Sequence, residues 1–182
     1  CDYVLSQKKA TGKIPADGQV VKSIVTTNLV DAIAASYDCE LIEVLTGFKY
    51  IGQQILKDEQ TGKGIYLFGM EESYGCLIGT YARDKDAISA TVALCEAAAY
   101  YKTKNMTLWD AMVALYEKYG YYKDAVKSIE LKGIEGLAKI QEILETLRNN
   151  TPVRIGDYHV VSARDYKLDT IKDMKTGEVK PT

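Results

Sequence analysis

Histidine is almost absent from this sequence, and its cysteines are not paired. His159 is the only histidine, and no obvious ligand residues accompany it. We therefore expect no metal ligand set in this chain and no Ser-His-Asp triad. The four cysteines form no CxxC pair, and a lone cysteine in a regular apolar pattern usually behaves as a small buried hydrophobe. This pattern indicates a reduced protein without disulfides, and the cytoplasm is its expected location.

The sequence also lacks a block of basic residues and a long apolar run. Its net charge of −2 and its pI of about 5.6 argue against a nucleic-acid-binding surface. The most apolar helical segment, residues 87–101, contains Glu96 and is too short to cross a bilayer. Residues 1–13 are charged and do not resemble a signal peptide. We therefore expect neither nucleic acid nor a membrane as a partner.

A short acidic loop is the most informative feature that the sequence does contain. The apolar run of residues 64–68 predicts a buried strand, and Gly69-Met70-Glu71-Glu72-Ser73-Tyr74-Gly75 follows it. Carboxylates accept hydrogen bonds, whereas the serine hydroxyl both accepts and donates them. This set of groups suits the vicinal hydroxyls of a sugar. A solvated acidic turn explains the same residues, and both interpretations stay open at this point.

Two further strands are predicted upstream of this loop. Residues 20–26 read as a strand followed by a helix, and residues 40–44 read as a second strand. The loop 45–49 and another helix then lead to the third strand. Alternating strands and helices of these lengths imply βαβ units and a largely parallel sheet. Because parallel strands end at one edge, the loops that contain Thr27, Thr46 to Lys49 and Glu71 to Ser73 are expected to meet there.

Residues farther along the chain leave alternatives open. Arg83-Asp84-Lys85-Asp86 precedes the long helix at 87–101, with Asp86 as a plausible N-cap. Lys85 is either a solvated helix-start residue or a group that returns to the loop edge. Residues 125–131 alternate like a half-exposed strand, and 133–148 form an amphipathic helical pattern. We expect one domain over residues 1–150. Over residues 151–182 we expect a linker and the beginning of a C-terminal domain, so the chain looks like a piece of a longer protein.

Four motifs together resemble one protein family. Each motif is weak alone, but their order and spacing are specific. They are Lys22-Ser23-Ile24-Val25-Thr26-Thr27, Leu45-Thr46-Gly47-Phe48-Lys49-Tyr50-Ile51-Gly52, Gly69-Met70-Glu71-Glu72-Ser73-Tyr74-Gly75 and Arg83-Asp84-Lys85-Asp86-Ala87. Over residues 1–148 the chain resembles the third domain of the α-D-phosphohexomutases, the phosphoglucomutase/phosphomannomutase family. Together with the strand pattern, this implies an α/β fold: a three-layer α/β/α sandwich around a mixed, largely parallel sheet of about four strands.

The resemblance implies roles for particular residues. Glu71 and Ser73 would bind the C3 and C4 hydroxyls of the sugar. Thr46, Gly47 and Lys49 would line the same site. Lys85 would lie near the transferred phosphate, as a catalytic residue or as a phosphate ligand. The implied substrate is a hexose phosphate, and Glu72 between Glu71 and Ser73 favours glucose or mannose phosphate over the glucosamine phosphates of related mutases.

The family's other catalytic motifs are absent from this sequence. These are the phosphoserine loop, the Asp-rich Mg²⁺ loop and the C-terminal phosphate loop. The resemblance therefore implies that this chain has no cofactor of its own and is inactive alone. The other domains of a parent chain would be its partners, and that parent would use Mg²⁺ and a hexose bisphosphate activator. Two alternatives stay open: a non-catalytic α/β module that binds a sugar or nucleotide, and a pure interaction domain.

Overall fold

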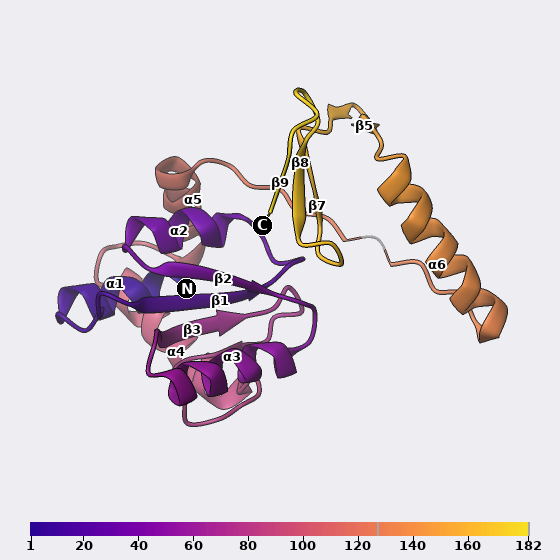
Figure 1. Cartoon of the computed structure of the whole chain (residues 1–182). Helices are drawn as coiled ribbons and strands as arrows, with labels where there is room; N and C mark the ends of the chain where they lie inside the picture. The colour runs from indigo at the N-terminus through magenta and orange to yellow at the C-terminus, as the bar shows by residue number, and fades with distance from the viewer. Residues whose placement is uncertain (127, 182) are drawn as a thin grey trace. The chain divides into compact units, whose positions relative to one another are not determined.

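The computed structural model describes residues 1–126 and 128–181, and they divide into two compact units, Cys1–Val126 and Lys127–Thr182 (Figure 1). This division lies earlier than the boundary expected at residue 150. The helix α6 (Gly133–Asn149) belongs to the second unit, where Arg148 Nε lies 2.7 Å from Asp165 Oδ2.

The first unit contains a four-stranded mixed sheet. Its strand order is β2 (Glu40–Val44), β1 (Gly18–Ser23), β3 (Ile65–Met70) and β4 (Cys76–Leu77). The central strand β1 pairs in parallel with both β2 and β3, whereas the short β4 runs antiparallel to β3. All six residues of β1 are buried, as expected of a strand with neighbours on both sides and helices on both faces. The predicted mixed, largely parallel sheet is confirmed.

Helices cover both faces of this sheet and complete three layers. Alternate residues of a strand point to opposite faces. Accordingly, Val20 packs with α1 (Asp2–Ala10) and α2 (Leu29–Ser36), and Val21 packs with α3 (Phe48–Thr61). Figure 1 shows α2 and α3 on opposite sides of the strands. The helix α5 (Leu108–Tyr119) adds Met112 and Tyr116 to the α2 layer.

The helix α4 (Ala87–Lys102) packs against β4 and α5. Asp86 is its N-cap, as predicted, because its carboxylate accepts hydrogen bonds from the backbone N–H groups of Ile88 and Ser89. The cap fixes where the helix begins. It therefore also fixes the preceding segment, which includes Lys85.

The second unit combines α6 with two small antiparallel sheets. The first is β5 (Arg154–Ile155) with β6 (Tyr158–His159). The second is β7 (Ser162–Asp165), β8 (Thr170–Asp173) and β9 (Val179–Pro181). The strand expected over 125–131 was wrong for residues 125–126 and 128–131, whereas residue 127 lies outside the described residues. The segment has the alternation of a strand, but its described residues pair with no neighbouring strand, and Val126 and Ile129 are exposed.

Two observations concern the chain as a whole. None of the helices in the described residues is long and apolar enough to cross a membrane. Cys1, Cys39, Cys76 and Cys95 are all free thiols.

Candidate functional site

The carboxyl ends of the three parallel strands meet at one edge of the sheet, as expected. The loop after β1 begins at Ile24, the loop after β2 contains Thr46 and Gly47, and the loop after β3 begins at Glu71. Open α/β sheets bind ligands at this edge because the loops there converge from adjacent strands. The contacts below show how closely the predicted residues approach one another.

Glu71 is a buried carboxylate at this edge, only 6% exposed. Its Oε1 accepts a hydrogen bond from the backbone N–H of Gly47 at 3.0 Å. Its own N–H donates to the carbonyl of Gly75 at 2.9 Å and closes the loop on itself. Charged side chains are rarely buried unless they are partnered. Glu71 is therefore held in a defined position and is not the solvated residue of an acidic turn.

Gly47 connects the β2 loop to Glu71 through the start of α3. It is the N-cap of α3 and has a φ of 119°, in the region that favours glycine. The first N–H groups of a helix have no partner within the helix, and the helix dipole is positive there. The carboxylate of Glu71 satisfies one of these donors. The loop after β2 and the loop after β3 are thus joined by a hydrogen bond that the positive end of the α3 dipole strengthens.

Lys85 returns to the same edge. Its Nζ lies 3.8 Å from Glu71 Oε2 and 5.6 Å from the centre of the Phe48 ring. The backbone N–H of Asp86 donates to the carbonyl of Cys76 at 3.0 Å and holds this segment beside β4. Gly75 makes room for the lysine stem, since a Cβ at that position would lie 2.6 Å from Lys85 Cδ. The Lys85 side chain is half exposed, so its ammonium borders solvent.

The Lys85 ammonium has a second acidic neighbour. Asp84 Oδ1 accepts hydrogen bonds from the backbone N–H of Lys85 at 2.8 Å and from its Nζ at 3.2 Å. These donors hold the pKa of the Asp84 carboxyl below its ordinary value. Asp84 therefore stays ionised, and the charge of Lys85 is shared between two carboxylates.

The remaining predicted residues lie on the same loops but point to solvent. Ser73, Thr46 and Lys49 are exposed. Lys49 Nζ lies 4.9 Å from the centre of the Tyr50 ring. Across residues 1–126 and 128–181, no hydrogen bond uses the Ser73 or the Thr46 hydroxyl. The structure thus brings Gly47 and Lys85 each into contact with Glu71 and leaves two hydroxyls and an ammonium exposed on the same loops.

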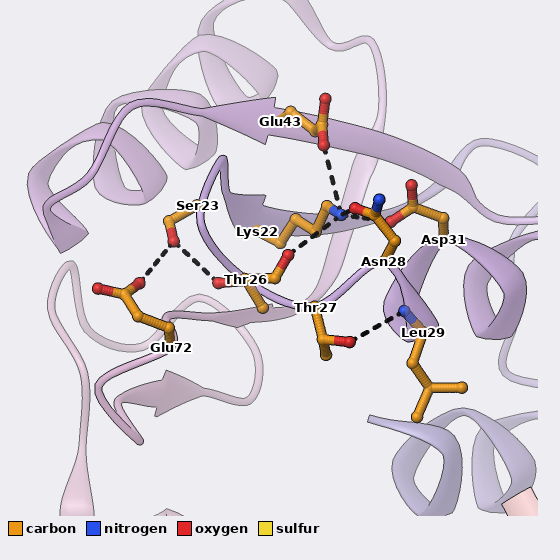
Figure 2. A network of polar contacts seen from close by, with 9 residues as sticks. All are labelled: Lys22, Ser23, Thr26, Thr27, Asn28, Leu29, Asp31, Glu43 and Glu72. Carbon is orange, nitrogen blue, oxygen red and sulfur yellow. Dashed lines mark hydrogen bonds and ion pairs between the residues drawn. The ribbon is translucent and has the colours of Figure 1, made fainter. Parts of the chain in front are cut away.

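A polar network under this edge was missed from the sequence (Figure 2). Glu72 Oε2 accepts a hydrogen bond from Ser23 Oγ at 2.8 Å, and Ser23 Oγ lies 2.8 Å from Thr26 Oγ1. Ser23 and Thr26 are buried. The available sequence signal was a set of polar residues, Lys22, Ser23, Thr26 and Thr27, at the end of a predicted strand.

Lys22 is the hub of this network and is fully buried. Its Nζ forms ion pairs with Asp31 and with Glu43 Oε1, the latter at 3.3 Å. It also donates to Asn28 Oδ1 at 2.9 Å and to the Thr26 carbonyl at 3.4 Å. A buried ammonium needs such compensation because it has lost its hydration. The network therefore fixes the loop after β1 to both β2 and α2.

The described residues do not fit a metal centre. In the parts of the chain that the structure describes, no group of three or more His, Cys, Asp or Glu side chains could hold an ion. The chemistry of this edge is that of a recognition surface instead: one buried carboxylate, a half-exposed ammonium and neighbouring hydroxyls. Such a surface can orient a polyhydroxylated, negatively charged ligand.

Comparison with known proteins decides the family. Residues 2–119 match the sequence model described as phosphoglucomutase/phosphomannomutase, alpha/beta/alpha domain III. The chain belongs to the phosphoglucomutase/phosphomannomutase family. The match covers every element of the sheet and every predicted contact residue, so the resemblance noted from the four motifs is confirmed.

Individual relatives agree with this family. The chain is 33% identical to a phosphoglucomutase of Staphylococcus saprophyticus over 158 residues, which are 87% of this chain and 29% of that protein. It is 37% identical over 149 residues to a phosphoglucomutase of Staphylococcus aureus strain RF122, covering 81% of this chain and 26% of that protein. The chain therefore spans less than a third of the length of these relatives.

A solved structure supports the fold. The open form of the exocytosis-sensitive phosphoprotein pp63/parafusin, a phosphoglucomutase from Paramecium, matches with a TM-score of 0.57 at 21% identity. The match covers 99% of this chain and 30% of that one. At this identity the match concerns the fold alone.

Proposed function

We propose that this chain is the sugar-recognition domain of a phosphoglucomutase or phosphomannomutase. The parent enzyme would interconvert hexose 1-phosphate and hexose 6-phosphate through a bisphosphorylated sugar. Glu71 and Ser73 would bind ring hydroxyls, with Thr46, Gly47 and Lys49 beside them. The observation that carries the proposal is the buried, fixed Glu71 carboxylate beside Lys85, on a loop that also presents the Ser73 hydroxyl.

The proposed recognition suits a reaction that occurs at both ends of a sugar. Transfer from O6 and transfer to O1 require the bound sugar to turn over between the two steps. Hydroxyls at C3 and C4 lie between these ends, so the same acceptor and donor groups can hold either orientation. Phosphoryl transfer depends mainly on positioning and on stabilising charge. Lys85 would supply positive charge near the phosphate, and Glu71 would fix the ring.

The remaining parts of the reaction are proposed for other domains of the parent chain. Mg²⁺, the phosphorylated serine and the hexose bisphosphate activator would act with groups elsewhere in the parent; among the described residues of this chain, no cluster of three or more His, Cys, Asp or Glu side chains could hold an ion. The proposed location is the cytoplasm, where thiols such as the four of this chain stay reduced.

Two preparations test the proposal. The purified 182-residue chain should not convert glucose 1-phosphate or mannose 1-phosphate, whereas the full-length parent should convert at least one of them. In the parent, Ser73→Ala should raise KM for that substrate about tenfold, the order expected for one lost hydrogen bond. Turnover by the isolated chain would contradict the proposed division of labour. A parent that binds sugar phosphates without converting them would favour the non-catalytic binding module.

A further inference from the structure

Glu72 separates two residues proposed to contact the sugar, yet its own carboxylate points the other way. Figure 2 shows the Glu72 side chain directed at Ser23, at the end of β1. The distance from Ser23 Oγ to Glu72 Oε2 is 2.8 Å. The contact spans 49 positions in the sequence and ties the β3 loop to the β1 loop. Glu72 is half-buried, whereas the neighbouring Ser73 and Tyr74 are exposed.

The partner of Glu72 begins a hydrogen-bonded turn, Ser23–Thr26. The Thr26 N–H donates to the Ser23 carbonyl at 2.9 Å, and the Ile24 N–H donates to the Val44 carbonyl at 2.9 Å. Lys22 Nζ donates to the Thr26 carbonyl at 3.4 Å. The turn is therefore closed on itself at Ser23, held to β2 through Ile24 and held to Lys22 through Thr26.

The direction of the hydroxyl hydrogen bonds follows from proton counting. A serine hydroxyl has one proton to donate, and an ionised carboxylate can only accept. The Ser23 hydroxyl therefore donates its hydrogen bond to Glu72, and the Thr26 hydroxyl donates to Ser23 Oγ. The result is a one-way chain from Thr26 through Ser23 to Glu72, in which each bond polarises the next. A carboxylate at position 72 suits the end of this chain, because bonds to ionised acceptors are the stronger ones.

We propose that Glu72, Ser23 and Thr26 form a loop anchor, a set of positioning residues that holds Glu71 and Ser73 at the spacing needed for the sugar. This inference rests on the proposed function for its kinetic consequence. Successive side chains of a short loop diverge from one another, so fixing the middle residue orients both of its neighbours. Glu72 therefore acts through Glu71 and Ser73, without touching the substrate. The acidic residue at 72, first interpreted as a sign of sugar preference, acquires a different role.

The anchor has a readout that does not depend on activity. Hydrogen exchange of the backbone amides of the loop Glu71–Gly75 measures local opening. In the full-length protein, Glu72→Ala and Ser23→Ala should each speed exchange of the Glu71 amide about tenfold or more, the order expected for losing a hydrogen bond to a charged group. Glu72→Gln should stay near the wild type, because its side-chain oxygen still accepts from Ser23.

A matched control separates anchoring from general loss of stability. Thr107→Ala also removes a hydroxyl that makes a structural hydrogen bond, but it lies outside the anchor. Thr107 is the N-cap of α5, and its Oγ1 accepts from the Asp110 N–H at 3.1 Å. It should lower the melting temperature without changing loop exchange. Loop exchange in Glu72→Ala or Ser23→Ala that equals that of Thr107→Ala would overturn the anchor, whatever the protein's activity.

Kinetics then test the link to the sugar site. In the full-length protein, Glu72→Ala and Ser23→Ala should raise KM for the converted hexose phosphate about tenfold, and the double variant should be no worse than either single variant. Additive effects, or an unchanged KM with faster loop exchange, would overturn the positioning role. If Ser73→Ala and Glu72→Ala both leave KM unchanged, the proposed sugar site is contradicted. If Ser73→Ala raises KM but Glu72→Ala leaves it unchanged, the sugar site is supported and the positioning role of the anchor is contradicted.

Discussion

The backbone N–H of Gly47 donates a hydrogen bond to Glu71 Oε1 over 3.0 Å and joins loops that follow two different strands. Only one carboxylate oxygen is used in this way, while the other faces Lys85 at 3.8 Å. The buried Glu71 side chain thus contacts both the N-cap of α3 and the Lys85 ammonium. The first two predictions concern this arrangement.

Glu71→Gln in the full-length enzyme should lower kcat/KM in both directions of the reaction. The glutamine oxygen can still accept from Gly47, so the loop should keep its shape and the melting temperature should change little. The variant loses the negative charge beside Lys85 and the stronger acceptor for a sugar hydroxyl. A hydrogen bond to a charged group is worth about 1.5–3 kcal/mol, which corresponds to roughly 10- to 150-fold in kcat/KM.

Steady-state assays with glucose 1-phosphate and glucose 6-phosphate measure this effect. The matched control is Glu142→Gln, which removes an equivalent charge from an exposed pair with Lys139 in α6. The control should behave like the wild type. Unchanged kinetics for Glu71→Gln would exclude its carboxylate from the sugar site.

Lys85→Met should reduce turnover much more than it reduces stability. Methionine keeps most of the apolar stem that packs near Phe48 and Gly75 but removes the charge. Because the Lys85 side chain is half exposed, its pairing with Glu71 contributes little to folding. We expect kcat to fall about tenfold or more, from lost stabilisation of phosphate charge.

Measuring kcat and the melting temperature of Lys104→Met provides the control, because Lys104 lies over the Tyr100 ring in a different loop. The two alternatives for Lys85 predict opposite results. A solvated helix-start residue would leave kcat near normal, with any loss confined to the melting temperature.

The sequence predicted the sheet and the meeting of the loops because hydrophobic runs and the alternation of strands and helices can be read directly along the chain. It predicted the return of Lys85 only as one of two alternatives, since the short antiparallel β4 that carries it there has just two residues, Cys76 and Leu77. It missed the contact between Ser23 and Glu72, because a serine in a strand gives no sign of which distant loop it binds. The strand predicted from the alternation at 125–131 was wrong for a related reason. A strand also needs a neighbouring strand to pair with, and the alternation does not indicate whether there is one.

Lys22→Met should strongly destabilise the first unit. Breaking a buried ion pair typically costs about 3–5 kcal/mol, and we expect the lower part of this range because the Asp31 carboxylate reaches solvent. Here Asp31 and Glu43 would both lose the ammonium. Urea unfolding of the 182-residue chain measures the loss. Lys139→Met, at an exposed pair, should cost about 1 kcal/mol at most, and equal losses for the two variants would contradict the hub role of Lys22.

Asp58 should destabilise the native state at neutral pH. It lies in α3 and is buried, with Oδ1 accepting from Gln54 Nε2 at 2.6 Å. Among the described residues, Oδ2 has no hydrogen-bond partner. Burial raises the pKa of the Asp58 carboxyl above its ordinary value, although the bond from Gln54 partly opposes the shift. The folded protein therefore holds this proton more tightly than the unfolded chain does.

The sign of the pH dependence follows from that difference. Between the unfolded and the raised folded pKa, the native state binds more protons than the unfolded state, so stability falls as pH rises through this window. Asp58→Asn removes the titration and keeps an acceptor for Gln54. We expect it to be more stable than the wild type near pH 7, because it no longer buries a charge at this position. The gain should shrink as the pH falls towards about 4, the ordinary range of a carboxyl, because the raised pKa makes the native carboxyl take up its proton before the unfolded one does.

Urea unfolding of both proteins at these two pH values measures the difference directly. Asp17→Asn, at an exposed carboxylate of the same unit, should leave stability unchanged at both. A variant that is less stable than the wild type at neutral pH would mean that the Asp58 charge has a compensating partner in the native state. A gain that is equal at both pH values would instead assign the effect to packing, because charge burial must disappear once the carboxyl is neutral.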